Sequence, residues 1–231
     1  WIKDTNGKKL VDFNLNNIHL VGYSQHINKK MSFAELKSHI YFSDEIPEAI
    51  PYRTTYYNVN WGFCVNKTQY DLLEKTDGLL EVFIDSEFDA KGSLSIGELL
   101  IPGRSDQEIL ISTYICHPSL ANDNLSGMLM TAFLARELLK QSTLKNSYRI
   151  IWVPETIGAI AYCALNESKM KKIKSGLVVT TVGGPGCFSY KQSFDANHPL
   201  NSVVEDVLKD EGLEYKKYPF DIRGSDERQY S

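Results

Sequence analysis

The sequence has few of the features that mark disulfide-rich, membrane or nucleic-acid-binding proteins. Its four cysteines (Cys64, Cys116, Cys163 and Cys187) are widely spaced and form no CxxC pair, which excludes a disulfide scaffold and a zinc finger. No run approaches the roughly 18 apolar residues of a membrane span, and no signal peptide is visible. A net charge of −4 and a pI near 5.8 give no basic footprint for nucleic acid. We therefore expect a cytoplasmic protein with reduced thiols that binds neither membrane nor nucleic acid.

The composition itself is that of an ordinary globular protein. The 231 residues are 42% hydrophobic and 23% charged, enough to build the core of one large domain or two small ones. The chain begins at Trp1 without a methionine and stops at Ser231. We expect it to be incomplete at both ends.

Residues 1–104 have the pattern of a β-rich domain. Alternating and aromatic segments with turn signals between them favour strands. The spacing of Ser32 and Glu35 is that of a capping box and predicts a helix over residues 33–40. The predicted strands cover residues 11–22, 54–65, 82–85 and 94–101.

Residues 105–231 have the pattern of an α/β domain. Continuous apolar strand segments alternate with helical ones, which predicts a mostly parallel, doubly wound sheet. The predicted strands cover 109–115, 149–153, 177–182 and 215–220, and the predicted helices cover 126–140, 157–165 and 201–210. The order indicates either two domains or a β-rich insertion in one α/β domain.

Three residues that can perform metal-assisted chemistry follow the predicted parallel strands. His117 and Asp123 lie in the loop after the first strand, and Glu155 comes directly after the second. Open α/β sheets bind ligands at the carboxyl ends of their strands. Zinc takes imidazole and carboxylate ligands and keeps a position for water. His117 and Asp123 would hold zinc, and Glu155 would be the general base or a further ligand.

Each of these residues also has a purely structural explanation. His117 could be a hydrogen-bonded loop residue, Asp123 an N-cap or Asx turn, and Glu155 a favourable charge at a helix N-terminus. Spacing alone leaves the two explanations balanced. Cys116 we assign to the core, because adjacent strand residues point to opposite faces and a contact with His117 is then difficult.

Short motifs add a resemblance to a known family. The loop NDNLSG at 122–127 resembles the metal-bridging loop of zinc aminopeptidases in the di-zinc exopeptidase clan, and PETIG at 154–158 resembles their Glu-Glu-x-Gly segment. More closely, the whole chain resembles the bacterial aminopeptidase-like family found near polysaccharide-biosynthesis genes. Typical strings of that family are ICHPSLAN at 115–122 and GSDERQY at 224–230.

The resemblance implies a zinc-exopeptidase fold with a small β-rich insertion and a hydrolase of peptide or related amide bonds. It also implies ligands that this chain lacks. Thr156 occupies the position of a ligating Glu, Thr180 lies near that of a ligating Asp, and the last His ligand would fall after Ser231. One zinc is therefore expected rather than two. Asp226 and Glu227 are additional candidate site residues, and the neighbouring Arg228 offers them an ordinary ion pair instead.

Two functions follow as alternatives. The first is a zinc-dependent aminopeptidase-like hydrolase acting on a peptide or small amide. The second is a catalytically inactive binding module with the peptidase fold, linked to cell-surface polysaccharide biosynthesis. The sequence leaves the substrate and the oligomeric state open, with a homo-oligomer among the alternatives.

Overall fold

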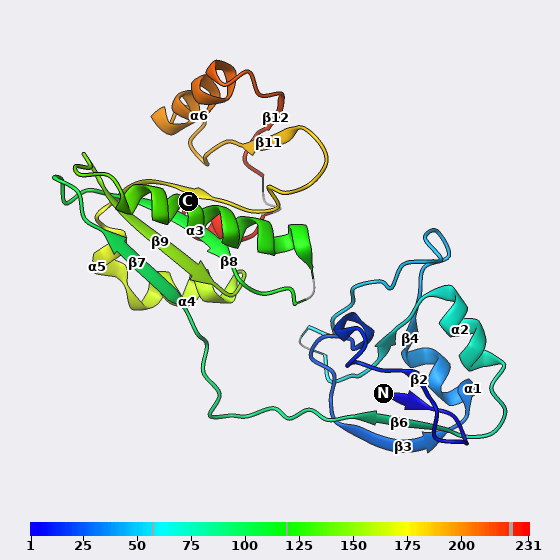
Figure 1. The fold of residues 1–231 in the computed structure, drawn as a ribbon. Coiled ribbons are helices and arrows are strands. Elements are labelled where there is room, and N and C mark those ends of the chain that lie inside the picture. Colours follow the sequence, from blue (N-terminus) through cyan, green and yellow to red (C-terminus); the bar gives the residue numbers. More distant parts are fainter. Residues whose placement is uncertain (57, 119, 222–223) are drawn as a thin grey trace. The chain divides into compact units, whose positions relative to one another are not determined.

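The computed structural model describes residues 1–231 except 57, 119, 222 and 223, and it divides into two compact units, Trp1–Gly92 and Ser93–Ser231 (Figure 1). The boundary lies earlier than the domain boundary predicted after residue 104. Strand β7 (Gly97–Ile101) accounts for the difference, because it pairs antiparallel with β9 (Ser147–Val153) of the second unit. The assignment of residues 94–101 to the β-rich part was therefore wrong.

The first unit is built on a four-stranded antiparallel sheet in the order β2-β1-β6-β3. Its strands are β1 (Ile2–Lys3), β2 (Lys9–Val11), β3 (Ile27–Met31) and β6 (Leu80–Ile84), with β4 (Ile40–Tyr41) and β5 (Phe63–Cys64) as a separate parallel pair. Its helices are α1 (Phe33–Leu36) and α2 (Lys67–Glu74), with 3-10 turns at Asn17–His19 and Lys37–His39.

Capping explains where the helices of this unit begin. The predicted capping box is present, since the Ser32 amide donates to Glu35 Oε2 at 2.8 Å and the Glu35 amide donates to Ser32 Oγ at 3.4 Å. Asn66 begins α2 in the same way, and that helix was not predicted. The strand predicted over 11–22 was wrong beyond Val11, because Asn16 caps a 3-10 turn there.

The first unit has its own apolar core between the sheet and the two helices. Buried positions alternate along β6, as expected for a strand with one face inward. The buried cluster consists of Ile2, Val11, Ile27, Met31, Leu36, Ile40, Phe63, Val65, Tyr70, Leu73, Leu80, Val82 and Ile84.

The second unit contains a four-stranded sheet in the order β10-β8-β9-β7, in which β8, β9 and β10 are parallel. Its remaining strands are β8 (Glu108–Tyr114), β10 (Ile173–Val178), β11 (Phe188–Lys191) and β12 (Tyr215–Tyr218), the last two forming a small parallel pair. Its helices are α3 (Gly127–Leu139), α4 (Ile157–Leu165), α5 (Glu167–Met170) and α6 (Pro199–Asp210), with turns at Ala121–Ser126 and Asp226–Gln229.

Helices cover both faces of this sheet (Figure 1). Ile111 and Ile150 belong to the core cluster that includes α3, whereas their neighbours Leu110 and Ile151 belong to the cluster that includes α4. Successive strand residues point to opposite faces, so both faces of β8 and β9 are apolar. The prediction of a mixed α/β fold with parallel strands is confirmed.

Most predicted elements of the second unit lie within a few residues of the observed ones, and the helix predicted over 157–165 coincides with α4. The strand predicted over 177–182 is displaced, because β10 begins at Ile173 and ends at Val178. The start of β10 was not predicted because it contains Lys174, Ser175 and Gly176, which interrupt the apolar pattern. Among the described strands, β10 lies at an edge of the sheet, where polar residues are tolerated.

A buried ion-pair network joins three strands of the sheet. Arg149 of β9 has a side chain only 5% exposed, and it donates to Glu108 of β8 and to Glu98 of β7. Lys169 of α5 also pairs with Glu98 at 3.0 Å.

No described helix is both long and apolar enough to cross a lipid bilayer.

Candidate active site

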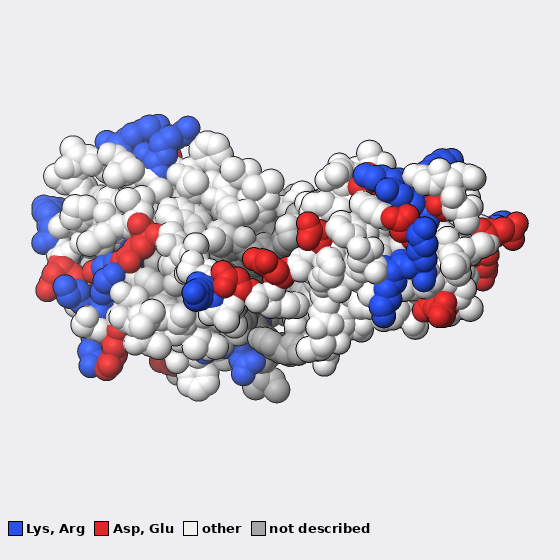
Figure 2. Space-filling model, turned by 90° about the horizontal axis from the view of Figure 1, so that it is seen from below, with Lys and Arg blue, Asp and Glu red and all other residues white. Residues whose placement is uncertain are grey.

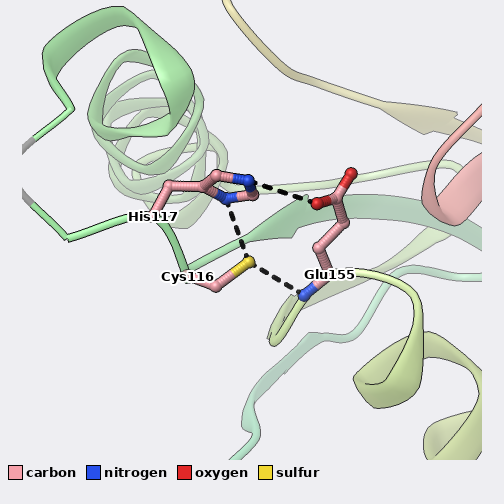
Figure 3. A group of neighbouring side chains, drawn as sticks. All are labelled: Cys116, His117 and Glu155. Atoms are coloured by element: carbon pink, nitrogen blue, oxygen red, sulfur yellow. Dashed lines mark hydrogen bonds and ion pairs between the residues drawn. The ribbon is translucent and has the colours of Figure 1, made fainter. Parts of the chain in front are cut away.

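His117 and Glu155 meet at the carboxyl ends of β8 and β9 (Figure 3). His117 Nε2 lies 3.4 Å from Glu155 Oε2, and the two side chains are 20% and 31% exposed. Cys116 Sγ lies 3.2 Å from His117 Nδ1, and the Glu155 amide donates to the same sulfur at 3.1 Å. We call Cys116, His117 and Glu155 the strand-end cluster.

The register of the sheet brings the cluster together. Tyr114 is the register partner of Val153 in the parallel β8–β9 pair, and the Ile115 amide donates to the Val153 carbonyl at 2.9 Å. The residues that follow the two strands therefore emerge side by side. This pairing explains why residues 39 positions apart form one site.

The assignment of Cys116 to the core, out of reach of His117, was wrong. That expectation assumed extended backbone, in which neighbours point apart. His117 instead has φ +69°, a left-handed conformation that is uncommon outside glycine. The turn brings the imidazole beside the thiol.

Positive φ recurs after all three parallel strands. His117, Thr156 (φ +62°) and Thr181 (φ +50°) follow β8, β9 and β10 respectively. Thr156 has ψ −66°, and the Ile157 amide donates to the Glu155 carbonyl at 2.7 Å, which is the rare and strained form of γ-turn. Such strain concentrates at functional sites because the surrounding structure must maintain it.

Asp226 supports the strained turn from the end of the chain. Its side chain is fully buried, and Oδ1 accepts a hydrogen bond from the Thr156 amide at 2.7 Å. Within the described residues, Oδ2 has no hydrogen-bond partner. Burial, with the nearby Glu155 carboxylate, raises the pKa of Asp226 to about 6. Asp226 therefore lies beside the strand-end cluster, although it is not one of its three members.

Glu227 has a different environment from Asp226. Its carboxylate accepts from the Ser225 amide at 3.0 Å and from Lys191 Nζ at 3.2 Å. Its ion pair is thus with Lys191 of β11, not with the adjacent Arg228 that the sequence suggested. These contacts tie the last turn of the chain to β11.

Asp123 lies outside the strand-end cluster and is linked to it through Tyr114. The Tyr114 hydroxyl donates to Asp123 Oδ1 at 2.7 Å and accepts from Thr180 Oγ1 at 2.6 Å. The Tyr114 and His117 rings are 5.4 Å apart between centroids. Burial and the Asp123 carboxylate raise the pKa of Tyr114, so its hydroxyl stays protonated and can donate. The sequence analysis missed Tyr114; a polar aromatic residue at the end of an apolar strand is the only signal for it.

Asn124 fixes the loop that carries Asp123. It is fully buried, and its amide donates to Thr113 Oγ1 at 2.7 Å and to the Tyr114 carbonyl at 2.9 Å. Its Oδ1 accepts from the Gly127 and Thr181 amides. A Cβ at Gly127 would lie 2.4 Å from Asn124 Oδ1, so this close approach requires glycine.

The donor atoms of the strand-end cluster fit a zinc ion. A sulfur, an imidazole nitrogen and a carboxylate oxygen lie within 4.8 Å of one another, the one such group of three in the described part of the chain. These are the three ligand types that zinc takes in proteins. Burial raises the pKa of the Cys116 thiol, and the hydrogen bond from the Glu155 amide opposes that rise.

An open, mostly apolar pocket of about 400 Å³ lies next to the cluster. It is lined by Ile115, Cys116, His117, Pro118, Leu120, Ala121, Leu125 and Met128. In the view of Figure 2, acidic and basic side chains lie interspersed, with contiguous basic groups among them.

Comparison with known proteins finds relatives of this α/β chain whose names refer to peptidases. A Clostridium acetobutylicum protein is 43% identical over 231 residues, which is 100% of this chain and 52% of that protein; its name describes it provisionally as a polysaccharide biosynthesis protein with an aminopeptidase-like domain. The crystal structure of a provisionally assigned peptidase from the same organism matches with a TM-score of 0.95 and 42% identity, covering 100% of this chain and 54% of that one.

The chain belongs to the family described as a domain of unknown function (DUF4910), whose model matches residues 5–231. It spans about half the length of the curated relative that it matches. An Acidobacteriales bacterium glutaminyl cyclase has a similar fold, with a TM-score of 0.51 at 16% identity over 66% of this chain and 56% of that one. That last likeness concerns the fold alone.

Proposed function

We propose that this chain carries the metal site of a zinc-dependent, aminopeptidase-like hydrolase built on the doubly wound zinc-exopeptidase fold. The observation that supports it most is the 3.4 Å approach of His117 Nε2 to Glu155 Oε2 at adjacent strand ends. Relatives named as a peptidase and an aminopeptidase-like protein point to the same chemistry.

In this proposal each site residue has one role. His117 and Asp123 would hold the zinc ion, which would supply a Lewis acid for an amide carbonyl. Glu155 accepts a proton from the attacking water and delivers it to the leaving amine. Tyr114 keeps Asp123 oriented through its 2.7 Å hydrogen bond.

The contacts of Thr180 and Thr156 favour one zinc ion over two. Thr180, near the position where the resemblance implies a ligating carboxylate, donates its hydroxyl to Tyr114 at 2.6 Å. Thr156 carries the strained turn instead of a carboxylate. Neither threonine offers zinc a carboxylate ligand.

The test is the Glu155→Gln variant of the full-length protein, assayed on a library of aminoacyl and N-acyl amides. Removing a general base typically lowers turnover about 10²- to 10⁴-fold, and zinc content should be unchanged because Glu155 is not a ligand in this proposal. Glu137→Gln, an exposed change on α3, is the control and should retain full activity. Undiminished turnover in Glu155→Gln would exclude the role of Glu155.

A second candidate is a binding module that keeps the fold without hydrolysis, in a protein of cell-surface polysaccharide biosynthesis. The hydrogen bond from Thr180 to Tyr114 favours it, since a structural contact replaces a ligand there. The relative's name supplies the biosynthetic connection. Saturable binding of a library compound without turnover would favour this candidate over the hydrolase.

A further inference from the structure

The Cys116 thiol has no part in the hydrolysis described above, yet it faces the same atoms. Its sulfur lies 3.2 Å from His117 Nδ1 and accepts from the Glu155 amide at 3.1 Å (Figure 3). It is also within 4.8 Å of a carboxylate oxygen of Glu155. A buried structural thiol would be surrounded by apolar groups instead.

We propose that Cys116 is a ligand of the metal ion, so that the site holds zinc through a thiolate as well as through His117. The inference rests on the proposed metal site and adds a ligand to it. Cys116 and His117 belong to the one group of potential ligand atoms within 4.8 Å of one another among the described residues, whereas Asp123 lies outside that group and contacts Tyr114. Cys116 and His117 would therefore be the two ligands that the structure already brings together, towards the three protein ligands plus one open position of catalytic zinc sites. Glu155 then remains available as the base.

The chemistry of the donor atoms selects zinc among divalent cations. Thiolate and imidazole favour zinc, whereas magnesium, calcium and manganese prefer sites made of oxygen atoms. The Glu155 amide that donates to Cys116 Sγ provides the kind of supporting hydrogen bond that orients metal ligands. Binding converts the thiol to a thiolate, since the sulfur–zinc bond replaces the S–H bond and the proton goes to solvent.

The charges around Cys116 also favour a cation. Glu155 and the fully buried Asp226 both place negative charge near the sulfur. In the described part of the chain, Asp226 Oδ2 lacks a hydrogen-bond partner, and an uncompensated buried charge is costly. A divalent ion held by Cys116 and His117 would offset both carboxylates.

The other cysteines provide matched controls. Cys163 is half-buried on α4, where its sulfur donates to the Gln229 carbonyl, and Cys187 is exposed. Neither belongs to a group of three potential metal ligands within the described residues.

The experiment replaces zinc by Co²⁺ in the full-length protein and records its absorption spectrum. A thiolate ligand gives a sulfur-to-cobalt charge-transfer band in the near ultraviolet. We expect the band in the wild type and in Cys163→Ser, and its loss in Cys116→Ser. Zinc affinity should fall at least about 100-fold in Cys116→Ser, because a direct ligand matters at least as much as a supporting residue.

A second measurement needs no variant. Bound zinc should protect Cys116 of the wild-type protein from alkylation, as measured by peptide mass spectrometry, while Cys187 reacts equally with and without zinc. Cobalt bound without the charge-transfer band, or alkylation of Cys116 at the same rate with zinc bound, would overturn the thiolate ligand and leave the proposed metal site standing. Failure to bind either zinc or cobalt would overturn both.

Discussion

His19 and His39 of the first unit differ from His117 of the second unit in what they contact. In Trp1–Gly92, His19 Nδ1 lies 2.7 Å from the Cys64 carbonyl, and His39 Nδ1 lies 2.9 Å from the Trp61 carbonyl. In Ser93–Ser231, His117 lies between a thiol and a carboxylate. Main-chain partners hold a ring in place, whereas ionisable side chains can exchange protons or share a metal.

The backbones of the two units differ in the same way. The first unit begins its helices with capping boxes, which satisfy exposed amides locally. The second unit places positive φ after each of its three parallel strands and buries Asp226 beneath one of these turns. The first unit also has two non-glycine residues at positive φ, Tyr23 and Tyr56. What distinguishes the second unit is that its strained residues follow the parallel strands, where function is expected.

The largest effect should come from the buried ion pairs of the second unit. Arg149→Met leaves the carboxylate of Glu108 buried without its partner, which should lower the unfolding free energy by about 3–5 kcal/mol. Faster hydrogen exchange of the β9 amides would report it. Arg104→Met, an exposed change, should have no such effect; equal exchange in both variants would show that the network contributes little.

Removing the buried charge of Asp226 should raise the unfolding free energy, the opposite of the effect expected for Arg149→Met. Because its pKa is raised to about 6, the folded protein retains a proton that the unfolded chain loses above about pH 4, and stability from this group falls as pH rises through 6. Asp226→Asn should therefore stabilise metal-free protein by about 2–3 kcal/mol at pH 7–8 and by nothing below pH 4. Urea denaturation across this pH range measures it, and a gain that does not change with pH would contradict the explanation.

The contrast between the histidines can be tested by matched substitutions. His19→Ala removes a buried ring and its hydrogen bond and should cost about 2–3 kcal/mol of stability without affecting metal content. His117→Ala should change stability by less than about 1 kcal/mol but abolish zinc binding. Thermal denaturation measures the stability of both variants, and elemental analysis measures their zinc content. Zinc retained in His117→Ala would mean that His117, like His19, has only a structural role.

The smallest effect concerns the capping box of the first unit. Ser32→Ala removes the acceptor of the Glu35 amide and should lower stability by about 1 kcal/mol. Ser202→Ala, within α6, is the control and should be neutral or slightly stabilising. Equal denaturation midpoints for Ser32→Ala and the wild type would mean that α1 depends on packing rather than on its cap.

Local sequence patterns predicted many of the strands and helices of the second unit. Apolar runs located β8 and β9, because these strands are largely buried. The helix α4 was predicted to the residue, because its sequence IGAIAYCAL is apolar along its whole length. Polar stretches were predicted less well. The start of β10 was missed because this edge strand begins with polar residues, and α2 was missed because it is a mostly polar helix of only eight residues.

The sequence by itself determined that His117, Asp123 and Glu155 follow strands of an α/β sheet, because strand periodicity and chain order are local properties. Only the tertiary structure decided which side chains meet. The left-handed turn at His117 brings Cys116 into the cluster, and the end of the chain brings Asp226 to Thr156, 70 residues away. Neither contact has a local signature, because each depends on backbone conformation and long-range packing that the residue pattern does not encode.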